Sequence, residues 1–168
     1  WISEVMLQQT QVKTVLPYYR KFIRTFPDVK SLALSDDEDV MQLWSGLGYY
    51  ARARNLHESA KIIHSKFQGK FPTKLADLVS LPGIGRSTAG AICSLALNQK
   101  TPILDGNVKR VFTRLYGIKD WAGVISVEKK LWVMAERNLP ESKFGNYNQA
   151  LMDLGATICV KKEPMCSQ

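Results

Sequence analysis

The stretch 81–110 constrains the fold more than any other part of the chain. It begins Leu-Pro-Gly-Ile-Gly-Arg-Ser, and Pro82 and Gly83 interrupt one helical pattern shortly before another begins near Arg86. Gly85 allows a tight turn at little steric cost. The sequence therefore predicts two helices joined by a short turn, with exposed amides at the second helix start that suit a phosphate. An ordinary corner between two helices would explain the same pattern.

A single carboxylate follows this hairpin. Asp105 lies in I-L-D-G-N-V-K-R, directly before another helical pattern. Aspartate is a preferred helix N-cap and Asp-Gly a common turn, so a capping role is as well founded as a catalytic one. The two roles are compatible, because a capping carboxylate is held rigidly and stays ionised near the positive helix end. Lys109, one turn on, is predicted to pair with Asp105 or to face a phosphate, and Arg110 to bind the DNA backbone.

Helical periodicity dominates the rest of the chain, and no strand alternation is convincing. We therefore predict an all-α fold. The expected helices cover 1–9, 10–26 with Thr10 as its cap, a short segment capped by Ser35 and ending before Gly46, 50–67, 73–80, 86–97, 107–116, 127–138 and 147–158. Cys93, Trp44 and Trp132 fall at apolar helix positions and are predicted to lie in the core, whereas His57 and His64 are predicted to lie on the surface.

Charge indicates the kind of partner. The 168 residues include 23 Lys and Arg against 15 Asp and Glu, a net charge of +8, and 45% are hydrophobic. Such a balance favours a polyanion, of which nucleic acid is the commonest, although a basic but indifferent surface would have the same composition. No apolar run approaches membrane-spanning length and no signal peptide is visible. Three cysteines make a disulfide framework an unlikely design and suit a reducing compartment.

Two further segments carry residues suited to DNA chemistry. Glu4 is the one acid in an otherwise uncharged stretch, 1–11. An acid in a first helical turn is ordinarily a surface group, but burial would raise its pKa and make it a proton donor. Tyr49 and Tyr50 follow a Gly-Leu-Gly turn and precede Arg52 and Arg54, which suits a wedge pushed into a base stack. The plainer interpretation is tyrosines at the core edge and solvated arginines.

Three motifs carry a resemblance to a known family. They are S-E-V-M-L-Q-Q-T-Q at 3–11, G-L-G-Y-Y-A-R-A-R-N-L at 46–56 and I-L-D-G-N-V-K-R at 103–110. Together with the hairpin they resemble the adenine DNA glycosylases, within the helix-hairpin-helix superfamily that includes endonuclease III. The resemblance runs over nearly the whole chain. It implies a helix-hairpin-helix glycosylase fold with two helical lobes flanking a DNA-binding cleft, one lobe formed by 31–139 and the other by 1–30 with 140–168.

The resemblance also implies a reaction. Adenine mispaired with guanine or 8-oxoguanine would be flipped out of double-stranded DNA and released by hydrolysis of its glycosidic bond. Glu4 matches the general acid that protonates adenine N7, and Asp105 matches the carboxylate that stabilises the oxocarbenium-like sugar. Both roles suit the chemistry, since a neutral leaving base needs a proton and a sugar cation needs an anion.

The remaining site residues are implied position by position. The hairpin residues Gly83 and Gly85 match the phosphate-binding turn, Tyr49 the intercalating residue, and Asn107 a residue supporting the pocket. The loop that reads the orphan guanine is matched by Gln8, Gln9 and Thr10, and a position near the flipped adenine by Gln149. Ser87 stands where bifunctional relatives carry a lysine nucleophile, so we expect a monofunctional enzyme with Lys109 as a DNA contact.

Cys159 and Cys166 match the first two of four cysteines in the family's cluster motif. We therefore expect a [4Fe-4S] cluster in a full-length protein, incomplete in this chain. Taken by themselves, two cysteines are no metal site. The opening on Trp1 and the end inside a cysteine motif suggest a piece of a longer protein. The resemblance further implies a monomer without membrane association, cytoplasmic and nucleoid-associated in a bacterium or nuclear in a eukaryote.

Two alternatives stay open at this point. One is an endonuclease III-like glycosylase/lyase acting on oxidised pyrimidines, against which Ser87 and the loop 8–10 argue. The other is a non-catalytic DNA-binding module that keeps the hairpin and the basic surface. The presence of both Glu4 and Asp105 argues against such a module, since binding DNA needs neither acid.

Overall fold

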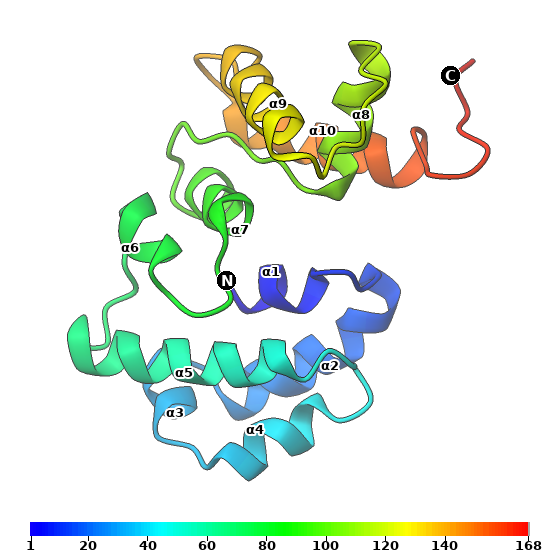
Figure 1. The fold of residues 1–168 in the computed structure, drawn as a ribbon. Helices are drawn as coiled ribbons and strands as arrows, with labels where there is room; N and C mark the ends of the chain where they lie inside the picture. The colour runs from blue at the N-terminus through cyan, green and yellow to red at the C-terminus, as the bar shows by residue number, and fades with distance from the viewer. Residues whose placement is uncertain (168) are drawn as a thin grey trace. The chain divides into compact units, whose positions relative to one another are not determined.

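The computed structural model describes residues 1–167, which form helices joined by loops (Figure 1). No strand occurs among these residues, which confirms the predicted all-α class. The helices are α1 (Ile2–Leu7), α2 (Val12–Thr25), α3 (Val29–Ala33), α4 (Asp37–Trp44), α5 (Ala51–Lys66), α6 (Leu75–Val79), α7 (Arg86–Ala91), the π-helical η1 (Ile92–Ala96), α8 (Gly106–Leu115), α9 (Ile125–Arg137) and α10 (Phe144–Thr157). None of the helices in the described part of the chain is long and apolar enough to cross a membrane.

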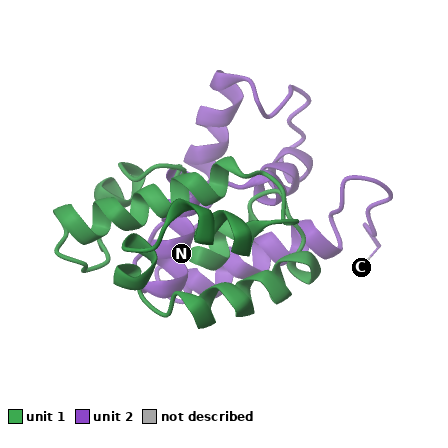
Figure 2. Ribbon diagram, turned by 90° about the horizontal axis from the view of Figure 1, so that it is seen from below, with its two compact units in different colours: residues 1–85 green, residues 86–168 purple. Residues whose placement is uncertain are grey.

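The chain divides into two compact units, residues 1–85 and 86–168 (Figure 2). The boundary falls inside the predicted hairpin, between its turn and its second helix. The lobes implied by the resemblance, 31–139 and 1–30 with 140–168, are a different division of the chain, and that division stays a prediction.

The first unit is built around α5, which packs against α1, α3 and α4, while α2 packs against α1 and α4. Trp44 is fully buried at the end of α4, as predicted, and the ring of Phe22 meets it edge-on at 6.1 Å between centroids. Edge-to-face pairs of this kind add to the stabilisation that burial of the rings supplies. The apolar core is formed by Val5, Met6, Val15, Phe22, Phe26, Leu32, Ala33, Val40, Trp44, Leu47, Ala53, Leu56 and Ala60.

The second unit is built around α8, which packs against α9 and α10. Its core is formed by Leu104, Val108, Val111, Phe112, Val127, Leu131 and Ala135. Cys93 in η1 is fully buried, as predicted, and burial raises the pKa of its thiol. Trp132 is only half-buried at the edge of this core, and the guanidinium of Arg86, which donates to Glu136, lies 3.9 Å from the centre of its ring.

The first unit differs from the prediction in one missed helix and one wrong helix cap. The missed helix is α3, whose N-cap Asp28 accepts a hydrogen bond from the Ser31 amide at 2.7 Å and forms a capping box with that serine. Ser35 does not cap the next helix. The N-cap of α4 is Asp36, while the Ser35 hydroxyl donates to the Leu32 carbonyl at 2.7 Å, closing the end of α3 instead.

Candidate functional site

The hairpin turn is anchored by apolar residues and by α5. Leu81 and Ile84 are buried, and the Ser59 hydroxyl of α5 donates to the Pro82 carbonyl at 3.0 Å. Gly83 has a φ of +75°, and a Cβ there would lie 2.9 Å from the Cβ of Asn55. The turn therefore requires glycine at 83 on two grounds, backbone conformation and close approach. Gly85 is exposed, with open space around an added Cβ.

The loop that follows α1 touches this turn. The Gln8 side-chain amide donates to the Gly83 carbonyl at 3.2 Å. Gln9 is exposed, with a φ of +55°. Thr10 does not cap α2 as predicted: the N-cap is Gln11, and the Thr10 hydroxyl donates to the Gln8 carbonyl and accepts from Arg52. The structure thus brings Gln8 and Thr10 into one hydrogen-bonded loop beside the hairpin turn.

Glu4 lies in the first turn of α1 and is partly buried. The next two residues of the helix, Val5 and Met6, are buried in the core of the first unit and hold α1 in place. The position of the carboxylate is therefore fixed by a short helix whose apolar face is anchored, which suits a group that must deliver a proton to one atom.

The glycine turn before α5 presents Tyr49. Its ring is 59% exposed and its φ is +51°. The Trp44 indole donates to the Gly48 carbonyl at 3.0 Å, so this core tryptophan holds the turn in place. An exposed aromatic on a fixed turn suits the predicted wedge.

Arg52, in contrast, is neither a solvated arginine nor an exposed one available for contact with DNA, the two predictions made for the arginines after the turn. Its side chain is buried, with 8% of the residue exposed, and its guanidinium bonds to the backbone of the first unit. Arg54, two residues further along α5, is exposed. Nothing in the local pattern A-R-A-R-N distinguishes the two arginines, so sequence reasoning missed the buried one.

Asp105 is the N-cap of α8. Its Oδ1 accepts from the Val108 amide at 2.8 Å, and its Oδ2 accepts from the Asn107 side-chain amide at 3.1 Å. The residue is partly exposed. The capping prediction is confirmed. Both oxygens keep accepting capacity for a further partner.

The segment leading to Asp105 is fixed on several sides. The Leu104 amide donates to the Ser87 hydroxyl at 3.2 Å. The Thr101 hydroxyl donates to the Gly90 carbonyl at 3.0 Å, and the buried Asn148 donates to the Thr101 carbonyl at 2.8 Å. Ser87, predicted as a marker of chemistry, thus also orients the backbone beside Asp105.

A polar path runs from Asp105 to Cys159. Asn107 accepts a hydrogen bond from Arg110 at 2.8 Å, and the Arg110 Nε donates to the Cys159 carbonyl at 2.7 Å. Lys109 pairs with Glu128 at 2.7 Å and not with Asp105, contrary to one of its predicted partners. Arg110 is satisfied by acceptors inside the second unit, so its predicted contact with a DNA backbone competes with those bonds.

The two terminal cysteines differ in setting. Cys159 is partly buried, and its sulfur lies 3.2 Å from a guanidinium nitrogen of Arg114, whereas Cys166 is exposed. The Arg114 side chain also donates to the Val160 carbonyl at 2.8 Å. A cation beside the sulfur suits a thiolate ligand. In residues 1–167, however, no group of three or more His, Cys, Asp or Glu side chains is arranged to hold a metal, so these two thiols do not complete a cluster site.

Gln149 lies exposed on α10, where its amide donates to Asp153 at 2.9 Å. Within the described second unit, none of its hydrogen bonds joins it to Asp105 or Asn107. Its role near a flipped base stays a prediction.

An open pocket of about 420 Å³ lies beside the start of α8, and sequence reasoning missed it. Lys109 and Arg110 line it together with Trp121, whose ring is 77% exposed and stacks on Gly123. The sequence signal for this pocket was Trp121, a tryptophan in the segment 117–123 between two helices. A large aromatic residue there has no helix face on which to be buried.

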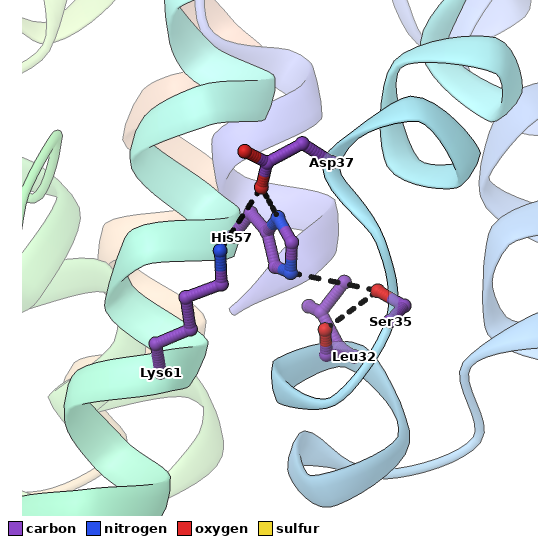
Figure 3. A network of polar contacts seen from close by, with 5 residues as sticks. All are labelled: Leu32, Ser35, Asp37, His57 and Lys61. Atoms are coloured by element: carbon purple, nitrogen blue, oxygen red, sulfur yellow. Dashed lines mark hydrogen bonds and ion pairs between the residues drawn. The ribbon is translucent and has the colours of Figure 1, made fainter.

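A second polar cluster lies inside the first unit (Figure 3). His57 is buried at 3% exposure, contrary to the surface position predicted for it; its Nδ1 lies 2.8 Å from Asp37, and its Nε2 3.5 Å from the Ser35 hydroxyl. The Lys61 ammonium and His57 together hold the pKa of the Asp37 carboxyl below its usual range. The order Ser–His–Asp is that of a hydrolase triad, but the Ser35 proton is directed to the Leu32 carbonyl. We therefore interpret the cluster as a structural link between α3, α4 and α5.

Comparison with known proteins was made by family, by sequence and by structure. The family model described as HhH-GPD superfamily base excision DNA repair protein matches residues 2–137. The chain is 54% identical over 167 residues to an adenine DNA glycosylase of Buchnera aphidicola (subspecies Acyrthosiphon pisum), covering 99% of this chain and 48% of that protein. It is 45% identical to the human adenine DNA glycosylase, covering 100% of this chain and 31% of the relative.

The structural comparison agrees. A solved thermostable thymine-DNA glycosylase superposes with a TM-score of 0.86 at 27% sequence identity, covering 99% of this chain and 77% of that one. The chain spans about half the length of the bacterial relative, or less in the human case.

Proposed function

Because this chain belongs to the HhH-GPD superfamily of base excision DNA repair proteins, we propose that it is the glycosylase core of an enzyme that releases mispaired adenine from DNA. The substrate is double-stranded DNA carrying adenine opposite guanine or 8-oxoguanine. The relatives named adenine DNA glycosylase, at 45% and 54% identity, support the choice of base.

The observation that carries the proposal is the fixed carboxylate of Asp105. Cleavage of a glycosidic bond develops positive charge on the sugar, and a preorganised anion stabilises that charge without having to move. Asp105 is held by the Val108 amide and by Asn107, and its backbone is tied through Leu104 to Ser87.

Glu4 supplies the proton in this proposal. Adenine leaves as a neutral base only if a ring nitrogen is protonated as the bond breaks, so a general acid is required on the base side. Glu4 lies partly buried on α1. In this proposal Glu4 donates a proton and Asp105 stabilises a cation, the two roles that carboxyl groups fill in glycosidases.

The first unit reads the duplex. The loop 8–10, the turn 48–49 that carries the exposed Tyr49, and the hairpin turn at Gly83 are connected through hydrogen bonds in that unit. Wedging Tyr49 into the base stack lowers the penalty of flipping adenine out, and the hairpin amides bind a phosphate. The net charge of +8 favours the same partner, and the enzyme acts as a monomer.

The reaction is monofunctional in this proposal. A lyase needs an amine nucleophile, whereas the Ser87 hydroxyl is an acceptor for the Leu104 amide and the Lys109 ammonium pairs with Glu128. In the full-length protein, Cys159 and Cys166 would supply two of the four thiolates of a [4Fe-4S] cluster, which holds the end of the chain in place when bound.

The test is single-turnover base release from a duplex with adenine opposite 8-oxoguanine, using the full-length protein and, beside it, residues 1–168. Alkali then reveals abasic sites as strand breaks. Asp105→Asn is the informative variant, because asparagine is an equally good N-cap, so the melting temperature should stay close to wild type. We expect it to slow release by roughly 10²–10³-fold, and Glu4→Gln by roughly 10²–10⁴-fold.

The other outcomes separate the alternatives. Strand cleavage without alkali, together with borohydride trapping that survives Lys109→Met, would indicate a lyase and refute the monofunctional reaction. Tight, salt-dependent binding of the duplex by the full-length protein without any base release would favour the non-catalytic module.

A further inference from the structure

The buried guanidinium of Arg52 donates hydrogen bonds to backbone carbonyls at the end of α1. Its Nη1 donates to Met6 at 2.6 Å, to Gln8 at 2.5 Å and, at 3.2 Å, to Val5. These carbonyls close α1, where the helix dipole is negative. The carbonyl dipoles therefore lie directly against the charge of the guanidinium.

The same guanidinium reaches the two segments on either side of it. Nη2 donates to the Thr10 hydroxyl at 3.0 Å and to the Gly48 carbonyl at 3.4 Å. Its carbon lies 5.1 Å from the ring centre of Tyr49 and 5.5 Å from that of Trp44, within reach of cation–π attraction. Arg52 therefore bonds to both the loop 8–10 and the turn 48–49.

Each of these segments contains a backbone conformation that its residue disfavours. Gln9 has a φ of +55° and Tyr49 a φ of +51°, in the left-handed region that favours glycine. Arg52 binds the residues flanking Gln9, namely Gln8 and Thr10, and the residue before Tyr49. Strain of this kind persists only where surrounding contacts fix the backbone, and it concentrates at functional sites.

We propose that Arg52 is a positioning residue that locks the loop 8–10 and the turn 48–49 into one arrangement, so that Gln9 and Tyr49 engage the duplex together. The inference rests on the proposed function, because it assigns Arg52 to the recognition step of that reaction. Arg52 acts through these two segments and touches no DNA, so its removal lowers discrimination of the mispair and spares non-specific affinity.

Arg54 is the matched control. It is exposed on the same helix, and the sequence predicts contact with DNA for it on the same grounds as for Arg52. A phosphate contact contributes to matched and mispaired duplexes alike, and its removal reduces the salt slope of log Kd by about 1. A positioning residue changes the ratio of the two affinities and leaves the slope unchanged.

The experiment compares wild type, Arg52→Lys and Arg54→Met in the full-length protein, each also carrying Glu4→Gln so that adenine is not released during the binding measurement. Dissociation constants are measured for mispaired and matched duplexes at several salt concentrations. 2-Aminopurine beside the mispair reports unstacking by its fluorescence, and melting temperatures report folding. Lysine keeps the charge but lacks the fork that reaches both segments.

For Arg52→Lys we expect the affinity ratio of mispaired to matched duplex to fall tenfold or more, with an unchanged salt slope and loss of the fluorescence rise at saturating protein. Full preference and full fluorescence in this variant would overturn the proposal, as would an equal loss of both affinities with a smaller slope. A wild-type protein without any preference for the mispair would refute the proposed function, and this inference, which rests on it, would fall as well. That outcome is distinct from the failure of Arg52→Lys to change the preference.

A second pair of variants tests the proposal if Arg52→Lys folds poorly. Thr10→Val removes the acceptor of Arg52 at the end of the loop and nearly preserves the shape, while Thr10→Ser keeps the hydroxyl. We expect the valine variant to lose several-fold in the affinity ratio and the serine variant to match wild type. A valine variant with the full affinity ratio would overturn the proposal even without data on Arg52.

Discussion

Gly90→Ala is the sharpest test of how the second unit positions its carboxylate. A Cβ at 90 would lie 2.3 Å from the Pro102 carbonyl oxygen, whereas real Cβ atoms essentially never come within 3.0 Å of a heavy atom. The difference, 0.7 Å, is the least by which the carbonyl must retreat. No flexible side chain can absorb it, because the nearest atoms belong to the Pro102 backbone.

The displacement falls on the segment that leads to Asp105. Displacements near 1 Å at a catalytic group reduce rates by up to about 10²-fold, so we expect base release to slow by roughly 10–100-fold. Overpacking costs about 1–3 kcal/mol, and alanine returns about 1 kcal/mol of helix propensity. The net loss of about 1 kcal/mol lowers the melting temperature by about 2–4 °C.

Ala91→Gly is the matched control, because it weakens the same helix without touching Pro102. Ala91 is buried, so its removal costs about 1 kcal/mol of propensity and about 0.8 kcal/mol of burial. Single-turnover release is measured for both variants well below their melting temperatures. Equal rates in the two variants, or a wild-type rate for Gly90→Ala, would refute the reasoning that the 102–105 segment sets the position of Asp105.

Two further predictions concern the first unit. Asp37→Asn removes a carboxylate whose pKa is lowered mainly by Lys61. A carboxylate with a lowered pKa stabilises the fold while it is ionised, above the usual carboxyl pKa, and this stabilisation is lost as the group is protonated in acid. The melting temperatures of variant and wild type should therefore differ near pH 7 and converge as the pH falls below 4. A gap that persists in acid would contradict the assignment. Gly83→Ala forces a positive φ on alanine and a 2.9 Å contact with Asn55, so it should lower both stability and DNA affinity, whereas Gly85→Ala, which meets open space, should change stability little in the same melting and binding assays.

Features encoded within a few residues were predictable from the sequence. The Asp105 cap follows from one residue type before one helical pattern, and the burial of Trp44 and Cys93 follows from helix periodicity. The helix starts at Thr10 and Ser35 were predicted wrongly for a related reason. Both side chains have the right chemistry for a cap, but competing partners, Arg52 for Thr10 and the Leu32 carbonyl for Ser35, take their hydrogen bonds.

Burial of charged and polar groups was not predictable, because it depends on partners far along the chain. Arg52 finds its acceptors on α1 and the loop after it, and His57 finds Asp37 across a helix connection. The default expectation for both residue types is the surface. In each case the acceptors are backbone carbonyls or a side chain that only the folded first unit supplies.

Three of the places where local preference fails in the first unit are linked to one another. A buried arginine, a glutamine with positive φ and a tyrosine with positive φ are three separate violations of residue preference, and hydrogen bonds from Arg52 connect them. Natural sequences tend to break such rules where function requires it and to compensate elsewhere. A single buried side chain that holds two strained segments is therefore a physical argument for a recognition surface at 8–10 and 48–49, and it adds to the argument from the resemblance.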